Sequence, residues 1–127
     1  LLIWIGQVLL KPAANFLGRE DFLHVQVLVP WTTPAARRII DATKREATTR
    51  NHRRILFDLT LLEKPDREMT RYWSGEYLAR QLGFPFKIAA FTAPQLITKF
   101  GENVAVNRFA NFRVFPDEAA AIQWLLE

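Results

Sequence analysis

The chain has 127 residues, of which 50% are hydrophobic and 13% aromatic, and it contains no cysteine. This composition is ample for one packed domain, and it excludes a disordered chain, a disulfide framework, a thiol nucleophile and a thiolate metal site. The net charge of +4 at pH 7 is a mild basic excess, which a dedicated nucleic-acid-binding domain would concentrate on one face or helix.

The longest apolar run, LLIWIGQVLL, covers residues 1–10 and is too short to span a bilayer. No basic segment precedes it as in a signal peptide, so we expect an edge or hairpin strand, with a remnant of a targeting segment as the alternative. Residues 11–21, KPAANFLGRED, contain Pro, Asn and Gly and are predicted to be a connection. The missing cysteine fits a reducing compartment, and we expect a cytoplasmic protein without a transmembrane segment.

Residues 22–30, FLHVQVLVP, show the clearest alternation in the chain and predict a half-buried strand. One side of this strand would carry Leu23, Val25, Val27 and Val29, and the other would carry His24, Gln26 and Leu28. Thr33 and Pro34 then predict a helix start, with a hydroxyl N-cap and proline at the first helical position. We expect this helix to run to about Thr49. Its apolar face would be formed by Ala36, Ile39, Ile40, Thr43 and Ala47.

Residues 54–59, RILFDL, are apolar at nearly every position, as in a central strand that is covered on both faces. A second helix is predicted over residues 67–82, with Asp66 as its N-cap and Gly83 past its end. One face of this helix would be lined by Met69, Tyr72, Gly75, Ala79 and Leu82.

Residues 86–92, FKIAAFT, predict the next strand, and Pro94 is expected to open a third helix that reaches residue 108. A short strand follows over residues 112–115. Asp117 would cap a last helix, with three residues facing inward: Ile122, Leu125 and Leu126. Strands that alternate with helices predict a single α/β domain over residues 1–127, with a largely parallel sheet of about five strands and about four helices. The first two strands, residues 1–10 and 22–30, would pair antiparallel at one edge.

Four segments resemble the STAS domain, the fold of bacterial anti-sigma-factor antagonists, and more specifically its SpoIIAA-like group of small bacterial proteins. These segments are RILFDLTLLE, RYWSGEYLARQLG, ITKFGENVAVNR and RVFPDEAAAIQWL. The resemblance implies a STAS-like mixed sheet and a non-enzymatic regulatory or protein-interaction module. The same group is likened to the CRAL-TRIO lipid-binding domains, which implies the alternative of a carrier for a small apolar or lipid-like ligand.

In anti-sigma-factor antagonists an Asp ends the third strand, and a serine two positions later is phosphorylated at the start of the next helix. The matching positions in this sequence are Asp58 and Thr60. The longer segment LLEKPDRE follows here in place of a glycine-containing turn, and it moves the helix N-terminus away from Thr60. Two hypotheses therefore stand. Either Thr60 is a phosphoacceptor and contact residue beside Asp58, or Asp58 accepts hydrogen bonds from loop amides and Thr60 ends the strand.

Lys99, Asn103 and Asn107 would form one stripe on the expected third helix, although Asn is a poor residue for a helix interior. They are candidate contacts to a ligand or partner, with Arg108 adding charge. The alternative is that Asn107 helps to end the helix and Asn103 bonds to a neighbouring loop.

Aromatic side chains on the second and third helices are candidates for an apolar pocket or a contact patch, and core packing is the alternative. They are Tyr72, Trp73, Tyr77, Phe100 and Phe109.

No motif in the sequence specifies a reaction. The two histidines, His24 and His52, lie far apart, Ser74 lacks the glycine elbow of a hydrolase, and the five glycines form no phosphate-binding loop. The acidic residues near the second helix are expected to be solvated rather than paired for acid–base chemistry. The basic residues between Arg37 and Arg54 lack interleaved aromatics, so nucleic acid is not the expected partner. We expect no metal, no cofactor and no enzyme, but a protein partner, with a homodimer as an alternative.

Overall fold

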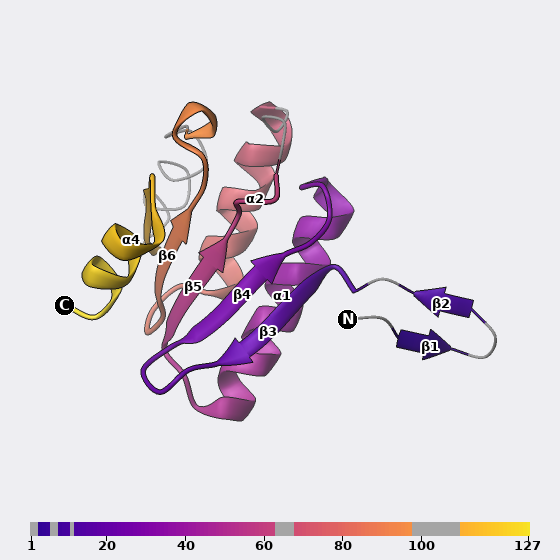
Figure 1. Cartoon of the computed structure of the whole chain (residues 1–127), viewed down its shortest axis with the longest axis horizontal. Coiled ribbons are helices and arrows are strands. Elements are labelled where there is room, and N and C mark those ends of the chain that lie inside the picture. The colour runs from indigo at the N-terminus through magenta and orange to yellow at the C-terminus, as the bar shows by residue number, and fades with distance from the viewer. Residues whose placement is uncertain (1–2, 6–7, 11, 63–67, 98–109) are drawn as a thin grey trace.

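The computed structural model describes residues 3–5, 8–10, 12–62, 68–97 and 110–127 of the chain. A hairpin of β1 (Ile3–Ile5) and β2 (Val8–Leu10) forms its own antiparallel pair. The main sheet has five strands in the order β3-β4-β5-β6-β7, and only the β3–β4 pair is antiparallel (Figure 1). These strands are β3 (Ala14–Gly18), β4 (Leu23–Val27), β5 (Arg54–Asp58), β6 (Lys87–Phe91) and β7 (Asn111–Phe115). The mixed α/β sheet predicted from the alternation of elements is therefore confirmed.

Helices cover both faces of this sheet. Among the described residues there are three α-helices and one 3-10 turn. They are α1 (Thr33–Arg50), α2 (Glu68–Gln81), the 3-10 turn η1 (Pro94–Leu96) and α4 (Glu118–Leu125). Helices α1 and α2 pack on one face and contribute to the main core, whereas α4 packs on the other face over β5, β6 and β7. In the described part of the chain, no helix has both the length and the apolar character that a bilayer crossing requires.

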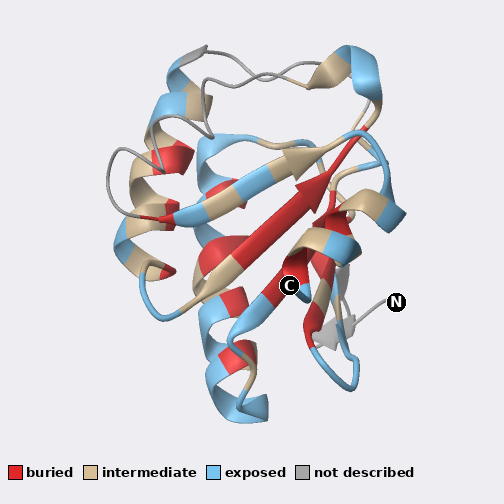
Figure 2. Ribbon diagram, turned by 90° about the vertical axis from the view of Figure 1, so that its left-hand side faces the viewer, coloured by how far each residue is buried: buried red, intermediate tan, exposed pale blue. Residues whose placement is uncertain are grey.

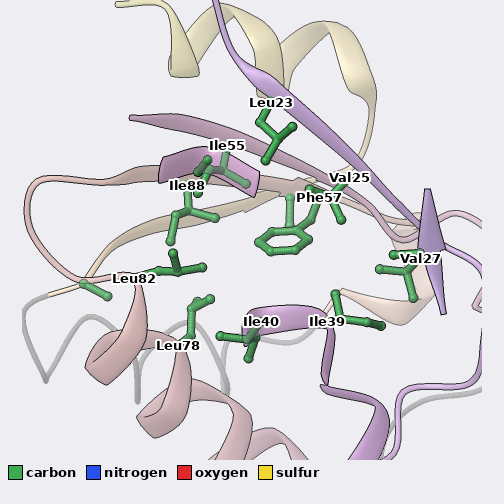
Figure 3. Packing of buried hydrophobic residues seen from close by; sticks show 14 residues of the cluster. Leu23, Val25, Val27, Ile39, Ile40, Ile55, Phe57, Leu78, Leu82 and Ile88 are labelled. Carbon is green, nitrogen blue, oxygen red and sulfur yellow. The ribbon is translucent and has the colours of Figure 1, made fainter. Parts of the chain in front are cut away.

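The strand residues alternate between two cores, as the pleat of a sheet requires. Ile55 and Phe57 face α1 and α2, while Leu56 and Asp58 lie on the α4 face. On the first face, β4 contributes Leu23, Val25 and Val27, as the sequence predicted (Figure 3). Figure 2 shows that the buried residues are concentrated along the central strands. β5 is thus the central strand that its apolar sequence predicted.

The expected connection at residues 11–21 is wrong, because Ala14–Gly18 form strand β3. This strand pairs antiparallel with β4 and occupies the sheet edge that was expected for residues 1–10. Pro12 lies before the strand and Gly18 is its last residue, so neither interrupts the hydrogen-bond ladder. Ala14 is buried, and Phe16 packs against the main core from the same face. Pairing with β4 therefore outweighs a composition that is typical of loops.

Two helix boundaries differ from the prediction. The N-cap of α1 is Thr32 rather than Thr33, because the Thr32 hydroxyl accepts the amide of Ala35 at 3.3 Å. The third helix does not run on from Pro94, since only one 3-10 turn forms and Ile97 is extended. The remainder of that expected helix, residues 98–109, lies outside the described residues, as does the expected N-cap Asp66. By contrast, Asp117 caps α4 as predicted and accepts the amide of Ala120 at 2.8 Å.

The predicted buried faces of α2 and α4 need partial correction. Met69 and Tyr72 are exposed, whereas the predicted Gly75 and Leu82 are buried. Ser74 and Leu78 complete the buried side of α2. Met69 and Tyr72 belong to the first turns of the described part of this helix. On α4, Leu126 is exposed, while Ala121 and Leu125 are buried against the sheet. All the residues predicted for the apolar face of α1 are buried.

Candidate functional site

The candidate site is built at the carboxyl end of the central strand β5. Asp58 is the last residue of β5, and its side chain is buried on the α4 face of the sheet. Its Oδ1 accepts two hydrogen bonds from Thr60, one from the backbone N–H at 2.9 Å and one from the hydroxyl at 2.5 Å. Thr60 itself is exposed. The carboxylate therefore fixes the first turn after the strand and presents Thr60 to solvent.

The turn is also tied to the neighbouring strand. The amide of Leu59 donates to the carbonyl of Phe91 at 2.9 Å, and the hydroxyl of the buried Thr92 donates to the carbonyl of Leu59 at 3.4 Å. The amide of Leu62 closes the turn by donating to Leu59 at 3.1 Å. These bonds hold Thr60 on a backbone that is anchored from both sides.

Exposed apolar side chains lie at the same edge of the sheet as Thr60. Leu61 follows it and is 53% exposed, and the first turns of α2 carry Met69 at 73% and Tyr72 at 36% exposure. Because α2 follows β5 directly, its N-terminal end lies at the edge where β5 ends. We call Thr60, Leu61, Met69 and Tyr72 the carboxyl-edge surface. Exposed large apolar side chains that gather at one end of a sheet are candidates for a binding surface.

Trp73 and Tyr77 lie on the seam between α1 and α2, and both are partly buried. Their rings stack with centroids 4.8 Å apart and planes within 11°. The Tyr77 hydroxyl donates to Oδ1 of Asp41 at 2.5 Å, and the Arg37 guanidinium lies 5.9 Å from the Tyr77 ring centroid. Lys44 extends the seam by donating to the Gln81 amide oxygen at 3.4 Å. Tyr77 therefore joins the two helices, and Trp73 stacks on its ring.

The hydrogen bond to Asp41 is the largest cause that raises the pKa of Tyr77 above its usual 10.0, and burial adds to the effect. The neutral hydroxyl can donate to the carboxylate, whereas a phenolate would meet it with like charge. Tyr77 is thus held in its protonated form.

Ser74 connects α2 to the chain segment before α1. Its hydroxyl donates to the carbonyl of Thr70 at 2.7 Å and accepts the indole N–H of Trp31 at 3.1 Å. Both partners are structural groups, and neither is a base that would activate a nucleophile. The prediction from sequence did not single out Trp31, although a tryptophan directly before a helix start is a candidate for such a contact.

His24 lies on the α4 face of β4, with its Nδ1 at 3.3 Å from the Arg19 guanidinium. Arginine can only donate, so Nδ1 is the acceptor and Nε2 carries the hydrogen of the neutral ring. Nε2 is buried and has no hydrogen-bond partner among the described residues. Burial first and the charge of Arg19 second lower the pKa of His24 below 6.5, while the carboxylates of Glu118 and Asp58 act in the opposite direction.

Six of the remaining sequence-predicted residues lie outside the described residues: Lys99, Phe100, Asn103, Asn107, Arg108 and Phe109. Within the described ranges, no three His, Asp or Glu residues are placed so that they could hold a metal ion. Of the expected aromatic group, Tyr72 is exposed at the carboxyl edge, while Trp73 and Tyr77 lie on the helix seam.

No family model matches this chain, and no curated protein matches it.

Proposed function

We propose that the chain is a STAS-like, non-enzymatic regulatory module that binds another protein through the carboxyl-edge surface. The observation that carries the proposal is the exposure of Leu61 and Met69 beside the anchored Thr60. Leaving two large apolar side chains in water is unfavourable, and burial against a partner would remove that cost. A partner that covers this edge would also contact the Thr60 turn.

The interior beneath α2 supports a surface function over a carrier function. Leu78 and Leu82 project from the α2 side toward Ile88 and Phe57 of the sheet, and all four side chains are buried (Figure 3). An apolar carrier would need a cavity in this region, because small ligands bury most of their surface in a concave site. In the described part of the chain, Leu78 and Leu82 instead pack as core between α2 and the sheet.

Thr60 is the regulatory position of this proposal. Thr60 is exposed, and its hydroxyl donates to the Asp58 carboxylate. A phosphate at this hydroxyl would bring about two negative charges, remove the donor and repel Asp58. The expected result is an altered Thr60 turn and a weaker complex with the partner.

The test is capture of a partner from a lysate of the source cells, followed by titration of the purified partner. The double variant Leu61→Ser/Met69→Ser is expected to bind at least about tenfold more weakly than the wild type, since central apolar contacts dominate interfaces. The matched control is Phe84→Ser, which removes an exposed apolar side chain from the opposite end of the sheet, where the parallel strands begin. Equal loss in the control, or no loss in the double variant, contradicts the proposal.

A further inference from the structure

An aromatic side chain protrudes at the end of the sheet where the parallel strands begin, which we call the amino edge. Phe84 is 95% exposed and is followed by the exposed Pro85 in the connection from α2 to β6. The next aromatic, Phe86, packs against the main core, and its amide donates to the carbonyl of Gly83 at 3.0 Å. The loop is therefore anchored at its base while Phe84 points into solvent.

Three exposed arginines lie around this loop. Arg53 and Arg54 lead into β5, and Arg80 lies in the last turn of α2. The amide of Lys87 donates to the carbonyl of Arg53 at 2.8 Å, and Lys87 is also the register partner of Arg54. This pairing places the two chain segments next to each other at the amino edge.

These three arginines are not neutralised within the described part of the chain. Among the described residues Arg50 pairs with Glu46 at 3.0 Å, whereas Arg53, Arg54 and Arg80 form no ion pair there. The neighbouring Lys87 ammonium is occupied, because it donates to the carbonyl of Trp124 at 2.6 Å. The guanidinium groups thus remain available to an anionic partner. We call Arg53, Arg54, Arg80 and Phe84 the amino-edge surface.

We propose that the amino-edge surface binds reversibly to a membrane that contains anionic phospholipids. The Phe84 ring would enter the interface between headgroups and acyl chains, and the arginines would contact lipid phosphates. A single-stranded nucleic acid is the less suitable polyanion, because base stacking along a strand uses successive aromatic platforms. Here one ring protrudes, and the other ring of the loop is turned into the core. With one inserted aromatic side chain and three arginines, we expect weak membrane binding that is lost at high salt.

The test is co-sedimentation of the full chain with vesicles of phosphatidylcholine, with and without phosphatidylserine. The wild type is expected to bind only the phosphatidylserine vesicles and to dissociate at high salt. Phe84→Ser is expected to lose about tenfold in partition coefficient. Arg53→Gln/Arg80→Gln is expected to lose roughly 25-fold, at about fivefold for each cation near an anionic surface.

Two control variants test whether vesicle binding depends on the amino-edge surface itself, rather than on net charge or on the carboxyl-edge surface. Arg38→Gln/Arg45→Gln removes the same charge from exposed positions of α1 and is expected to retain most binding. Leu61→Ser/Met69→Ser is expected to bind vesicles like the wild type. The proposal is overturned if the wild type ignores phosphatidylserine, or if both arginine double variants lose binding equally. It is also overturned if a single-stranded oligonucleotide binds in a Phe84-dependent manner and vesicles do not.

Discussion

One carboxylate oxygen of Asp58 accepts both the backbone amide and the hydroxyl of Thr60, at 2.9 and 2.5 Å. The strand thereby ends in a turn whose donors are satisfied by a buried acceptor. The Asp58 carboxylate performs this role, and the described part of α2 begins at Glu68. The geometry is that of an Asp that ends a strand, and it leaves the Thr60 side chain on the surface.

This arrangement predicts unequal effects of its two residues on stability. Asp58→Ala removes the shared acceptor and is expected to lower the free energy of unfolding by about 2 kcal/mol, whereas Thr60→Ala removes one hydroxyl donor and costs about 1 kcal/mol or less. Asp58→Asn and Thr60→Ser keep an acceptor and a donor, and they serve as controls with smaller losses. Urea denaturation measures all four. A larger loss for Thr60→Ala than for Asp58→Ala would show that the carboxylate does not organise the turn.

The Tyr77–Asp41 hydrogen bond predicts a measurable titration. Because the folded pKa of Tyr77 is raised above 10.0, the hydrogen bond stabilises the fold fully below that pH and is lost as pH rises through the folded value. The difference in phenolate absorbance between the wild type and Tyr77→Phe isolates this titration. Asp41→Asn is expected to lower the Tyr77 pKa. An unchanged titration in Asp41→Asn would exclude the carboxylate as its cause.

The environment of His24 predicts a loss of stability in mild acid. The pKa of His24 is lowered in the folded state, so the folded protein favours the neutral imidazole. The resulting stabilisation is complete above about pH 6.5 and is lost as the pH falls through the pKa of the folded state. NMR titration of the imidazole protons measures the pKa directly. Arg19→Gln is expected to raise it by removing a like charge, and Glu118→Gln is expected to lower it by removing a carboxylate. Shifts in the same direction for both variants would contradict the assignment of these charges.

The N-cap of α1 predicts a difference between two adjacent threonines. Thr32→Ala removes the hydroxyl that accepts the Ala35 amide and should destabilise the fold by about 1 kcal/mol. Thr33→Ala is expected to change stability by less than about 0.5 kcal/mol, since Thr33 is exposed in the first helical turn. Thermal unfolding of both variants tests this order. Equal destabilisation would mean that Thr32 is not the cap.

Elements with strong local signals were predictable from sequence, and elements that depend on neighbours were not. β4 alternates, β5 is apolar at nearly every position, and Asp117 precedes an apolar helix, so each carries its own signal. β3 lacks such a signal, because Ala14–Gly18 becomes a strand through its ladder with β4. The strand propensities of the residues in a segment do not include the free energy that pairing with a neighbouring strand provides.

The candidate site was predictable where its residues are close in sequence. Asp58 and Thr60 are two positions apart, and a strand-ending Asp commonly bonds to the amide two residues on. The exposure of Met69 was not predictable, because helical spacing does not tell where a helix extends beyond the sheet that it covers. Nor was the Tyr77–Asp41 contact, which depends on how α1 and α2 are rotated against each other.

The strands of the main sheet follow one another in space in the same order as along the chain, from β3 to β7. In doubly wound folds, nucleotides and other small ligands occupy the crevice where successive connections leave a sheet in opposite directions. The order of the described strands never reverses, and α1 and α2 pack against each other on one face of the sheet. Within the described residues, the strand order therefore gives no crevice of this kind between α1 and α2.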